Sequence, residues 1–199
     1  MAEPIDFYYD FGSPAAYLAW TQLANVCAEF DCEVSYRPML LGAVFKATGN
    51  ETPVNVKAKA DWIMQDFARF AARYDVPFNL NPHFIINSMA MMRGAIWAMQ
   101  EGCLERYNEA MFRATWIDGR NTGELVEITA VVADAGLDAA AMTKAIQTQE
   151  VKDGLKSITE EAVARGVFGA PTFFVNGIMH FGQDRLDFVR EALNKSSGR

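Results

Sequence analysis

The sequence predicts an α/β fold in which two β-containing ends of the chain enclose a long helical middle. Strand-forming residues are confined to the ends, and Ala-, Met- and charge-rich stretches with helical spacing fill residues 57–155. The 199 residues are 51% hydrophobic, which suffices for a substantial core without disulfides. We therefore expect residues 1–40 and 156–199 to form one discontinuous α/β domain, and residues 41–155 to form an all-helical insertion.

The N-terminal end predicts a strand, a helix and a second strand. Ile5–Asp10 is β-branched and aromatic, and a Gly-Ser-Pro turn separates it from the apolar stretch at 15–30. Pro14 suits the first turn of a helix, where its missing N–H costs nothing, so Ser13 is expected at or beside the N-cap. A second strand is expected over Glu33–Arg37.

The remaining elements follow from breaks in the helical pattern and from a late β-prone segment. Strands are expected over Thr172–Val175 and Ile178–Phe181, joined by the turn Asn176-Gly177. A last helix is expected from Gln183 or Asp184 to Leu193. The predicted breaks within the helical block are YDVPFNLNPHF, TWIDGRN and the DAGLD turn at 134–138.

The net charge and the N-terminal sequence argue against nucleic-acid and membrane partners. The formal net charge is -7, without a Lys or Arg run that could follow a phosphate backbone, so we expect no nucleic-acid binding. The N-terminus carries acidic residues where a secretory signal would be basic, and no apolar run is long enough to span a bilayer. We expect a cytoplasmic protein without a membrane partner.

The cysteines and histidines do not form a metal-site pattern. Cys27, Cys32 and Cys103 are odd in number and contain no CxxC pair, which argues against a disulfide framework or a zinc site. We interpret them as ordinary buried or half-buried thiols. His83 and His180 lie far apart in the sequence and outside any HxxH pattern. We expect no metal site.

A proline stands directly before the late strand. Because proline removes a ladder donor, it is tolerated there mainly at the first residue or at a sheet edge. Pro171 is thus either an ordinary trans proline at a strand start or a cis proline. In the cis form, the backbone N–H and C=O of Ala170 would turn outward and could pair with an extended peptide.

Two motifs together resemble one fold family. FYYDFGSPAAYLA at 7–19 is similar to FYxDFxSPxxYLA of the 2-hydroxychromene-2-carboxylate isomerases, and APTFFV at 170–175 completes the arrangement. The wider group includes DsbA-type disulfide oxidoreductases and kappa-class glutathione transferases. The resemblance implies a thioredoxin-like fold with a large all-helical insertion, and a cis Pro171.

Ser13 is the candidate catalytic residue. Where DsbA-type proteins have C-P-x-C, this chain has Ser13-Pro14-Ala15-Ala16, so thiol–disulfide exchange through the site is excluded. The resemblance implies that glutathione supplies the thiol as a cofactor. A hydroxyl donor and the positive end of a helix would stabilise its thiolate. A plain helix N-cap is the alternative role for Ser13.

The resemblance also implies the residues that hold glutathione. KAKADWIMQDFARF places Lys59, Trp62, Asp66 and Arg69 at the spacing of the family's K-x-x-Y-x-x-x-D-x-x-R, and FGQDRL at 181–186 resembles FxGxDRL. Lys59 would pair with the glycine carboxylate, and Asp184 with the γ-glutamyl ammonium. A solvated lysine and a helix-capping aspartate are the alternatives. The cofactor-binding set implied is Ser13, Asn50, Lys59, Ala170, Pro171, Gln183, Asp184 and Arg185.

The substrate slot is expected to be apolar. Trp62 replaces the family's usual tyrosine, and Asn87 matches a family asparagine, although a helix N-cap would explain Asn87 equally well. Phe45, Met39 and Trp116 are the other candidates for the slot.

The resemblance implies a glutathione-dependent isomerase that acts in aromatic-compound catabolism. Reversible thiolate addition would convert 2-hydroxychromene-2-carboxylate to trans-o-hydroxybenzylidenepyruvate. The expected partner is therefore a small aromatic or unsaturated carboxylate, and a homodimer is compatible with the resemblance. A kappa-like transferase that conjugates electrophiles and a non-catalytic peptide-binding module are the alternative functions.

Overall fold

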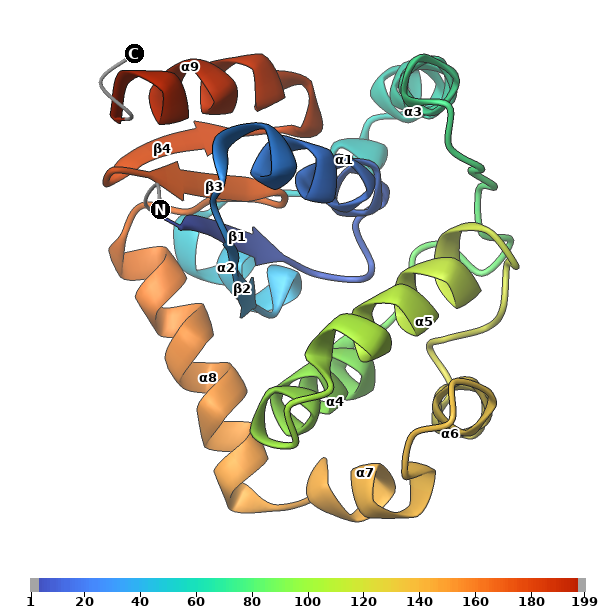
Figure 1. Cartoon of the computed structure of the whole chain (residues 1–199). Coiled ribbons are helices and arrows are strands. Elements are labelled where there is room, and N and C mark those ends of the chain that lie inside the picture. The colour runs from blue at the N-terminus through green and yellow to red at the C-terminus, as the bar shows by residue number, and fades with distance from the viewer. Residues whose placement is uncertain (1–3, 197–199) are drawn as a thin grey trace.

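The computed structural model describes residues 4–196 and contains one four-stranded sheet in the order β2-β1-β3-β4 (Figure 1). β1 (Ile5–Tyr9) pairs in parallel with β2 (Val34–Pro38). β3 (Thr172–Val175) is antiparallel to β1 and to β4 (Ile178–Phe181). The strands expected from the sequence are therefore present within a residue or so of their predicted bounds. Residues 1–3 and 197–199 of the expected α/β domain lie outside the described part.

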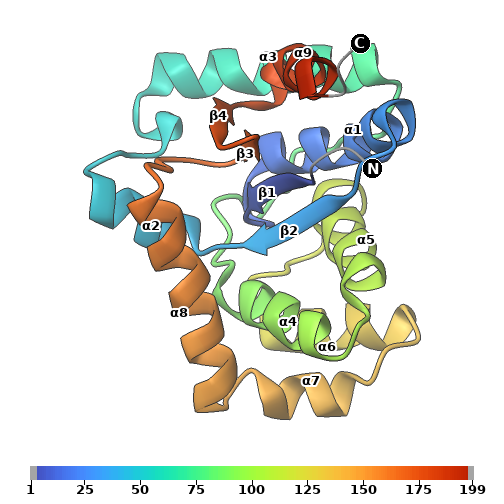
Figure 2. The ribbon, with the colours of Figure 1, turned by 60° about the vertical axis from the view of Figure 1, so that its left-hand side comes forward.

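The two faces of the sheet are covered by different helices. α1 (Pro14–Phe30) and α9 (Leu186–Ser196) contact each other, and α9 packs on β3. α8 (Gln149–Ala164) packs against β2 and α2 on the other face, as Figures 1 and 2 show. Because side chains alternate along a strand, neighbouring residues of β1 belong to two separate core clusters.

The middle of the chain is helical, as expected. It comprises α2 (Leu41–Thr48), the 3₁₀ turn η1 (Pro53–Asn55), α3 (Lys57–Tyr74), α4 (Met89–Gln100), α5 (Leu104–Trp116), α6 (Leu125–Asp134) and α7 (Ala139–Ala145). The sequence did not predict the breaks at 101–103 and 146–148. In the first, Gly102 adopts φ 65°, and in the second Thr148 caps α8 by accepting the Val151 N–H at 3.3 Å.

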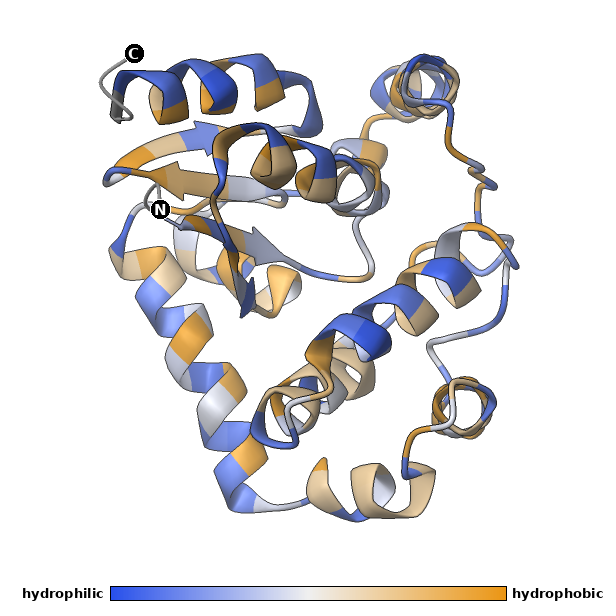
Figure 3. Ribbon diagram, viewed as in Figure 1, coloured by the Kyte–Doolittle hydropathy of each residue, from blue (hydrophilic) through white to orange (hydrophobic). Residues whose placement is uncertain are grey.

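The helical part and the sheet share one hydrophobic core. Tyr9 on β1 donates its hydroxyl to Asn108 on α5 at 2.7 Å, and the rings of Phe11 and Phe112 meet edge to face at 4.8 Å. α8 crosses the expected boundary at residue 155 without interruption, and its hydrophilic and hydrophobic residues alternate along its length (Figure 3). The insertion therefore packs as a continuation of the α/β part.

None of the helices in residues 4–196 is both long and apolar enough to cross a membrane. The same residues contain no cluster of three or more His, Cys, Asp or Glu side chains suited to a metal ion.

Candidate active site

Ser13 lies at the start of α1, and two hydrogen bonds fix its place. Its backbone N–H donates to Asp10 O at 3.0 Å, and its Oγ accepts the Ala16 N–H at 3.1 Å. Pro14 occupies the first helical turn. Ser13 is therefore a true N-cap, and its hydroxyl also lies where the helix dipole is positive.

The turn before Ser13 is organised by the buried carboxylate of Asp10. This side chain accepts the Gly12 N–H, the Leu41 N–H and the Ser88 hydroxyl, each at 2.8 Å. Burial raises the pKa of Asp10, while the three donors act to lower it. One carboxylate thus joins the Ser13 turn to the start of α2 and to the residue before α4.

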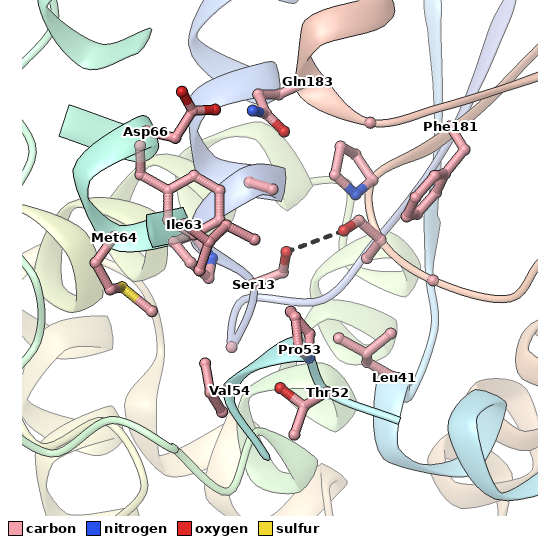
Figure 4. A pocket seen from close by; sticks show the side chains of 18 of the residues that line it. Ser13, Leu41, Thr52, Pro53, Val54, Ile63, Met64, Asp66, Phe181 and Gln183 are labelled. Atoms are coloured by element: carbon pink, nitrogen blue, oxygen red, sulfur yellow. Dashed lines mark hydrogen bonds between the residues drawn. The ribbon is translucent and has the colours of Figure 1, made fainter. Parts of the chain in front are cut away.

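The segment before β3 faces Ser13. The Ala170–Pro171 peptide bond is cis, and the Ser13 hydroxyl donates to Ala170 O at 3.2 Å, the dashed line in Figure 4. Pro171 O accepts the Gly182 N–H at 3.0 Å, and Asn50 Nδ2 donates to Phe168 O at 2.8 Å. These bonds hold together three stretches that are distant in sequence.

A cavity of about 300 Å³ opens above Ser13. Eight of the expected site residues line it: Ser13, Phe45, Asn50, Trp62, Ala170, Pro171, Gln183 and Asp184. Its volume is at the lower end of the range for small-molecule sites. The ends and the middle of the chain therefore combine to form one site.

The cavity has a polar side and an apolar side. Figure 4 places Asp66 and Gln183 on one side of Ser13, and Leu41, Pro53 and Val54 on the other. Gln183 is 8% exposed, and its backbone carbonyl accepts the Tyr74 hydroxyl at 2.8 Å. Burial raises the pKa of Tyr74 to about 12, so this donor stays protonated at neutral pH.

Three expected site residues stand outside the lining. Lys59 is exposed on α3, and Arg185 is exposed beside the cavity, with its guanidinium 3.4 Å from Asp184. Asn87 is exposed and accepts the Met89 N–H at 3.2 Å, but the N-cap residue of α4 is Ser88, so Asn87 precedes the cap. Trp62 does line the cavity but is 58% exposed, so it lies at the mouth.

Two candidates for the apolar slot are wrong. Met39 is fully buried against Tyr8 and Val44 in the core beneath α2. Trp116 is also fully buried, and its Nε1 donates to Phe11 O at 2.8 Å, so it supports the turn before Ser13 from below. Neither side chain lines the Ser13 cavity, because both are enclosed by the core residues around them.

Several lining residues were not predicted as site residues. Asp66 matches the aspartate of the family's K-x-x-Y-x-x-x-D-x-x-R spacing, and this match is the sequence signal that could have placed it in the site. The apolar residues are carried by η1, α2, α3, the 81–88 loop and β4, whose local sequence gives no such signal. They are Leu41, Pro53, Val54, Ile63, Met64, Phe67, Phe84 and Phe181.

Known proteins match this chain over nearly its whole length. The DsbA-like thioredoxin domain matches residues 4–194. The 2-hydroxychromene-2-carboxylate isomerase of Sphingobium xenophagum is 32% identical over 195 residues, covering 97% of this chain and 99% of that protein. Glutathione S-transferase kappa 1 of Rattus norvegicus is 25% identical over 206 residues, covering 96% and 91%.

A solved structure shows the same architecture. A 2-hydroxychromene-2-carboxylate isomerase superposes with a TM-score of 0.88 at 28% identity, over 96% of this chain and 95% of that one. The resemblance seen in the two end motifs is thereby confirmed along the whole chain. This protein belongs to the DsbA-like thioredoxin family, as a relative of the 2-hydroxychromene-2-carboxylate isomerases.

Proposed function

We propose that this protein is a glutathione-dependent isomerase of the 2-hydroxychromene-2-carboxylate type, acting in the cytoplasm on an aromatic or unsaturated carboxylate. The observation that carries the proposal is the Ser13 hydroxyl, which begins α1 in a cavity whose lining contains no cysteine. Thiolate chemistry at this position needs a sulfur from outside the chain. Relatives named as isomerases, and others named as glutathione transferases, support glutathione as its source.

The cavity residues fit the chemistry of glutathione. When bound, glutathione would supply a thiolate for reversible addition to the conjugated substrate, which allows rotation about the former double bond. The Ser13 hydroxyl makes a 3.2 Å bond to Ala170 O and can turn to donate to a sulfur instead. The N-terminus of α1 favours the same negative charge.

The two sides of the cavity suit two different groups. Glu51, Asp66 and Asp184 are the acidic residues of the lining, which contains no lysine or arginine, and Asp66 and Asp184 would take the γ-glutamyl ammonium group. Leu41, Val54 and Phe84 offer an apolar surface to an aromatic ring. The glycine carboxylate would lie toward Asn50, with Lys59 reaching in from outside.

Calorimetry with glutathione and S-methylglutathione tests this proposal. We expect both to bind, because the γ-glutamyl and glycine ends are the same in each. The non-catalytic peptide-binding alternative predicts that neither binds. After turnover of 2-hydroxychromene-2-carboxylate, mass spectrometry should find glutathione unchanged. A stable conjugate would instead identify a kappa-like transferase.

We expect Asp184→Ala to weaken glutathione binding by about 1–3 kcal/mol, because a charge-assisted hydrogen bond to the ammonium group is lost. Asp187→Ala is the matched control. Asp187 follows within one turn and is 92% exposed, and it lies outside the cavity lining. Equal affinities of the two variants in calorimetry would remove Asp184 from the binding site.

A further inference from the structure

A second cavity lies between α2, α4 and α8, on the face of α2 opposite to Ser13. Its volume is about 560 Å³, within the usual range for small-molecule sites. Leu41 and Phe45 line the Ser13 cavity, whereas Ala43 and Ala47 line this one. With 3.6 residues per turn, the two pairs lie on opposite sides of the helix. Figure 2 shows α2 and α8 side by side.

The wall of this cavity is mainly apolar. Leu155 is buried at its base, and the Thr159 hydroxyl beside it already accepts the Leu40 N–H at 3.0 Å. Such a wall offers little to a purely polar ion. The apolar lining residues are Leu40, Ala43, Ala47, Met89, Leu155, Val163 and Ala164.

The arginine of this lining has no counter-ion among residues 4–196. Arg93 is half-buried on α4, and within residues 4–196 its buried Nε has no hydrogen-bond partner and its guanidinium has no carboxylate partner. A buried donor without an acceptor is costly and rare. Every other half-buried arginine in the described chain has a carboxylate: Arg37 at 3.3 Å, Arg120 at 2.9 Å, Arg165 at 2.7 Å and Arg190 at 3.1 Å.

The remaining charges at this cavity leave it positive. Lys152 is half-buried on α8 and, within the described residues, forms no ion pair. Lys156 and Glu160 lie 3.7 Å apart and balance each other at the rim. The cavity therefore presents two unpaired cations on a protein whose net charge is -7.

We propose that this second cavity binds a small amphipathic monocarboxylate, such as a medium-chain aliphatic acid. The apolar chain would lie between α2 and α8, and the carboxylate would accept hydrogen bonds from Arg93, with Lys152 nearby. A guanidinium matches a carboxylate in both shape and charge. Inorganic phosphate would leave the apolar wall uncovered, and a neutral lipid would leave Arg93 without an acceptor.

Calorimetric titration with decanoate and 1-decanol tests this proposal. We expect decanoate to saturate one site and 1-decanol to bind at least about tenfold more weakly, because it lacks the charge. Arg93→Gln should weaken decanoate binding roughly 10- to 100-fold. Arg106→Gln is the matched control, since Arg106 is exposed on α5 and outside this cavity. Circular dichroism verifies that each variant is folded.

A second pair of variants locates the site and keeps the test decisive. Ala47→Phe adds bulk at the exposed rim of the second cavity and should weaken decanoate binding. Trp62→Ala alters the Ser13 cavity and should leave the affinity for decanoate unchanged. If Arg93→Gln and Ala47→Phe both bind decanoate with the affinity of the wild type, the proposal is wrong. Absence of binding, together with a loss of dimers in sedimentation on Ala47→Phe, would instead identify an interface between copies of the chain.

Discussion

Replacing Ser13 by Ala is expected to lower isomerase turnover roughly 10- to 1,000-fold at neutral pH, by analogy with the loss of one preorganised donor. The helix terminus and Pro14 remain, so the fold should lose only the contribution of a cap, about 0.5–2 kcal/mol. The activity loss therefore reflects the missing donor and not unfolding. Steady-state kinetics and urea unfolding of the same preparations separate the two effects.

The pH dependence of the Ser13→Ala enzyme gives the mechanism a second test. A hydroxyl that donates to a thiolate favours the charged form, so its loss should raise the pKa of the bound thiol. Turnover should then recover partly at alkaline pH, where the thiolate forms without assistance. Ser35→Ala, a hydroxyl deletion on β2 outside the cavity, should leave the profile unchanged. Identical ultraviolet thiolate titrations for wild type and Ser13→Ala would refute the role assigned to Ser13.

Replacing Asp10 by Ala is expected to destabilise the protein by about 2–5 kcal/mol. The substitution leaves the Gly12 N–H, the Leu41 N–H and the Ser88 hydroxyl without their acceptor. Since Asp10 is 1% exposed, water cannot replace it without local rearrangement. Urea unfolding followed by circular dichroism measures the free energy directly. Activity should also fall, because the Ser13 turn loses its anchor.

Two further variants calibrate the Asp10 prediction. Ser88→Ala removes one of the three bonds and should cost about 1 kcal/mol. Asp153→Ala removes an exposed carboxylate, bonded to Gln149 at 2.8 Å on α8, and should change stability by less than about 0.5 kcal/mol. If Asp10→Ala unfolds like Asp153→Ala, the carboxylate is not the anchor of the turn.

The raised pKa of Asp10 predicts the direction in which the free energy of unfolding changes with pH. Burial raises its pKa above the ordinary 3.8, so the folded protein binds more protons than the unfolded chain between the two pKa values. Stability from this group therefore falls as pH rises through that interval. The Asp10→Ala protein should lack this component, which urea unfolding at several acidic pH values would detect.

The sequence by itself determined the secondary structure at both ends and the chemical character of Ser13. β-Branched and aromatic residues predicted β1 and β3, because strand propensity is local. The Ser-Pro pair predicted the start of α1, because N-cap preferences depend on adjacent residues. Serine at position 13 and alanine at position 16, where DsbA-type proteins have cysteines, excluded thiol–disulfide exchange through this site without any structure. These inferences need only neighbouring residues, so the structure changed their bounds little.

Only the tertiary structure decided which residues share the cavity. The Ser13 to Ala170 bond joins positions 157 residues apart, and the Asn50 to Phe168 bond joins positions 118 apart. Met39 and Trp116 are apolar like the true lining, yet they face the core, because the side of the backbone on which a residue lies depends on packing. Likewise, the sequence shows Arg93 as one more helical arginine. The sequence has no acidic residue three or four positions from Arg93, but only the packing of α2, α4 and α8 reveals that none of residues 4–196 supplies a carboxylate from a distance.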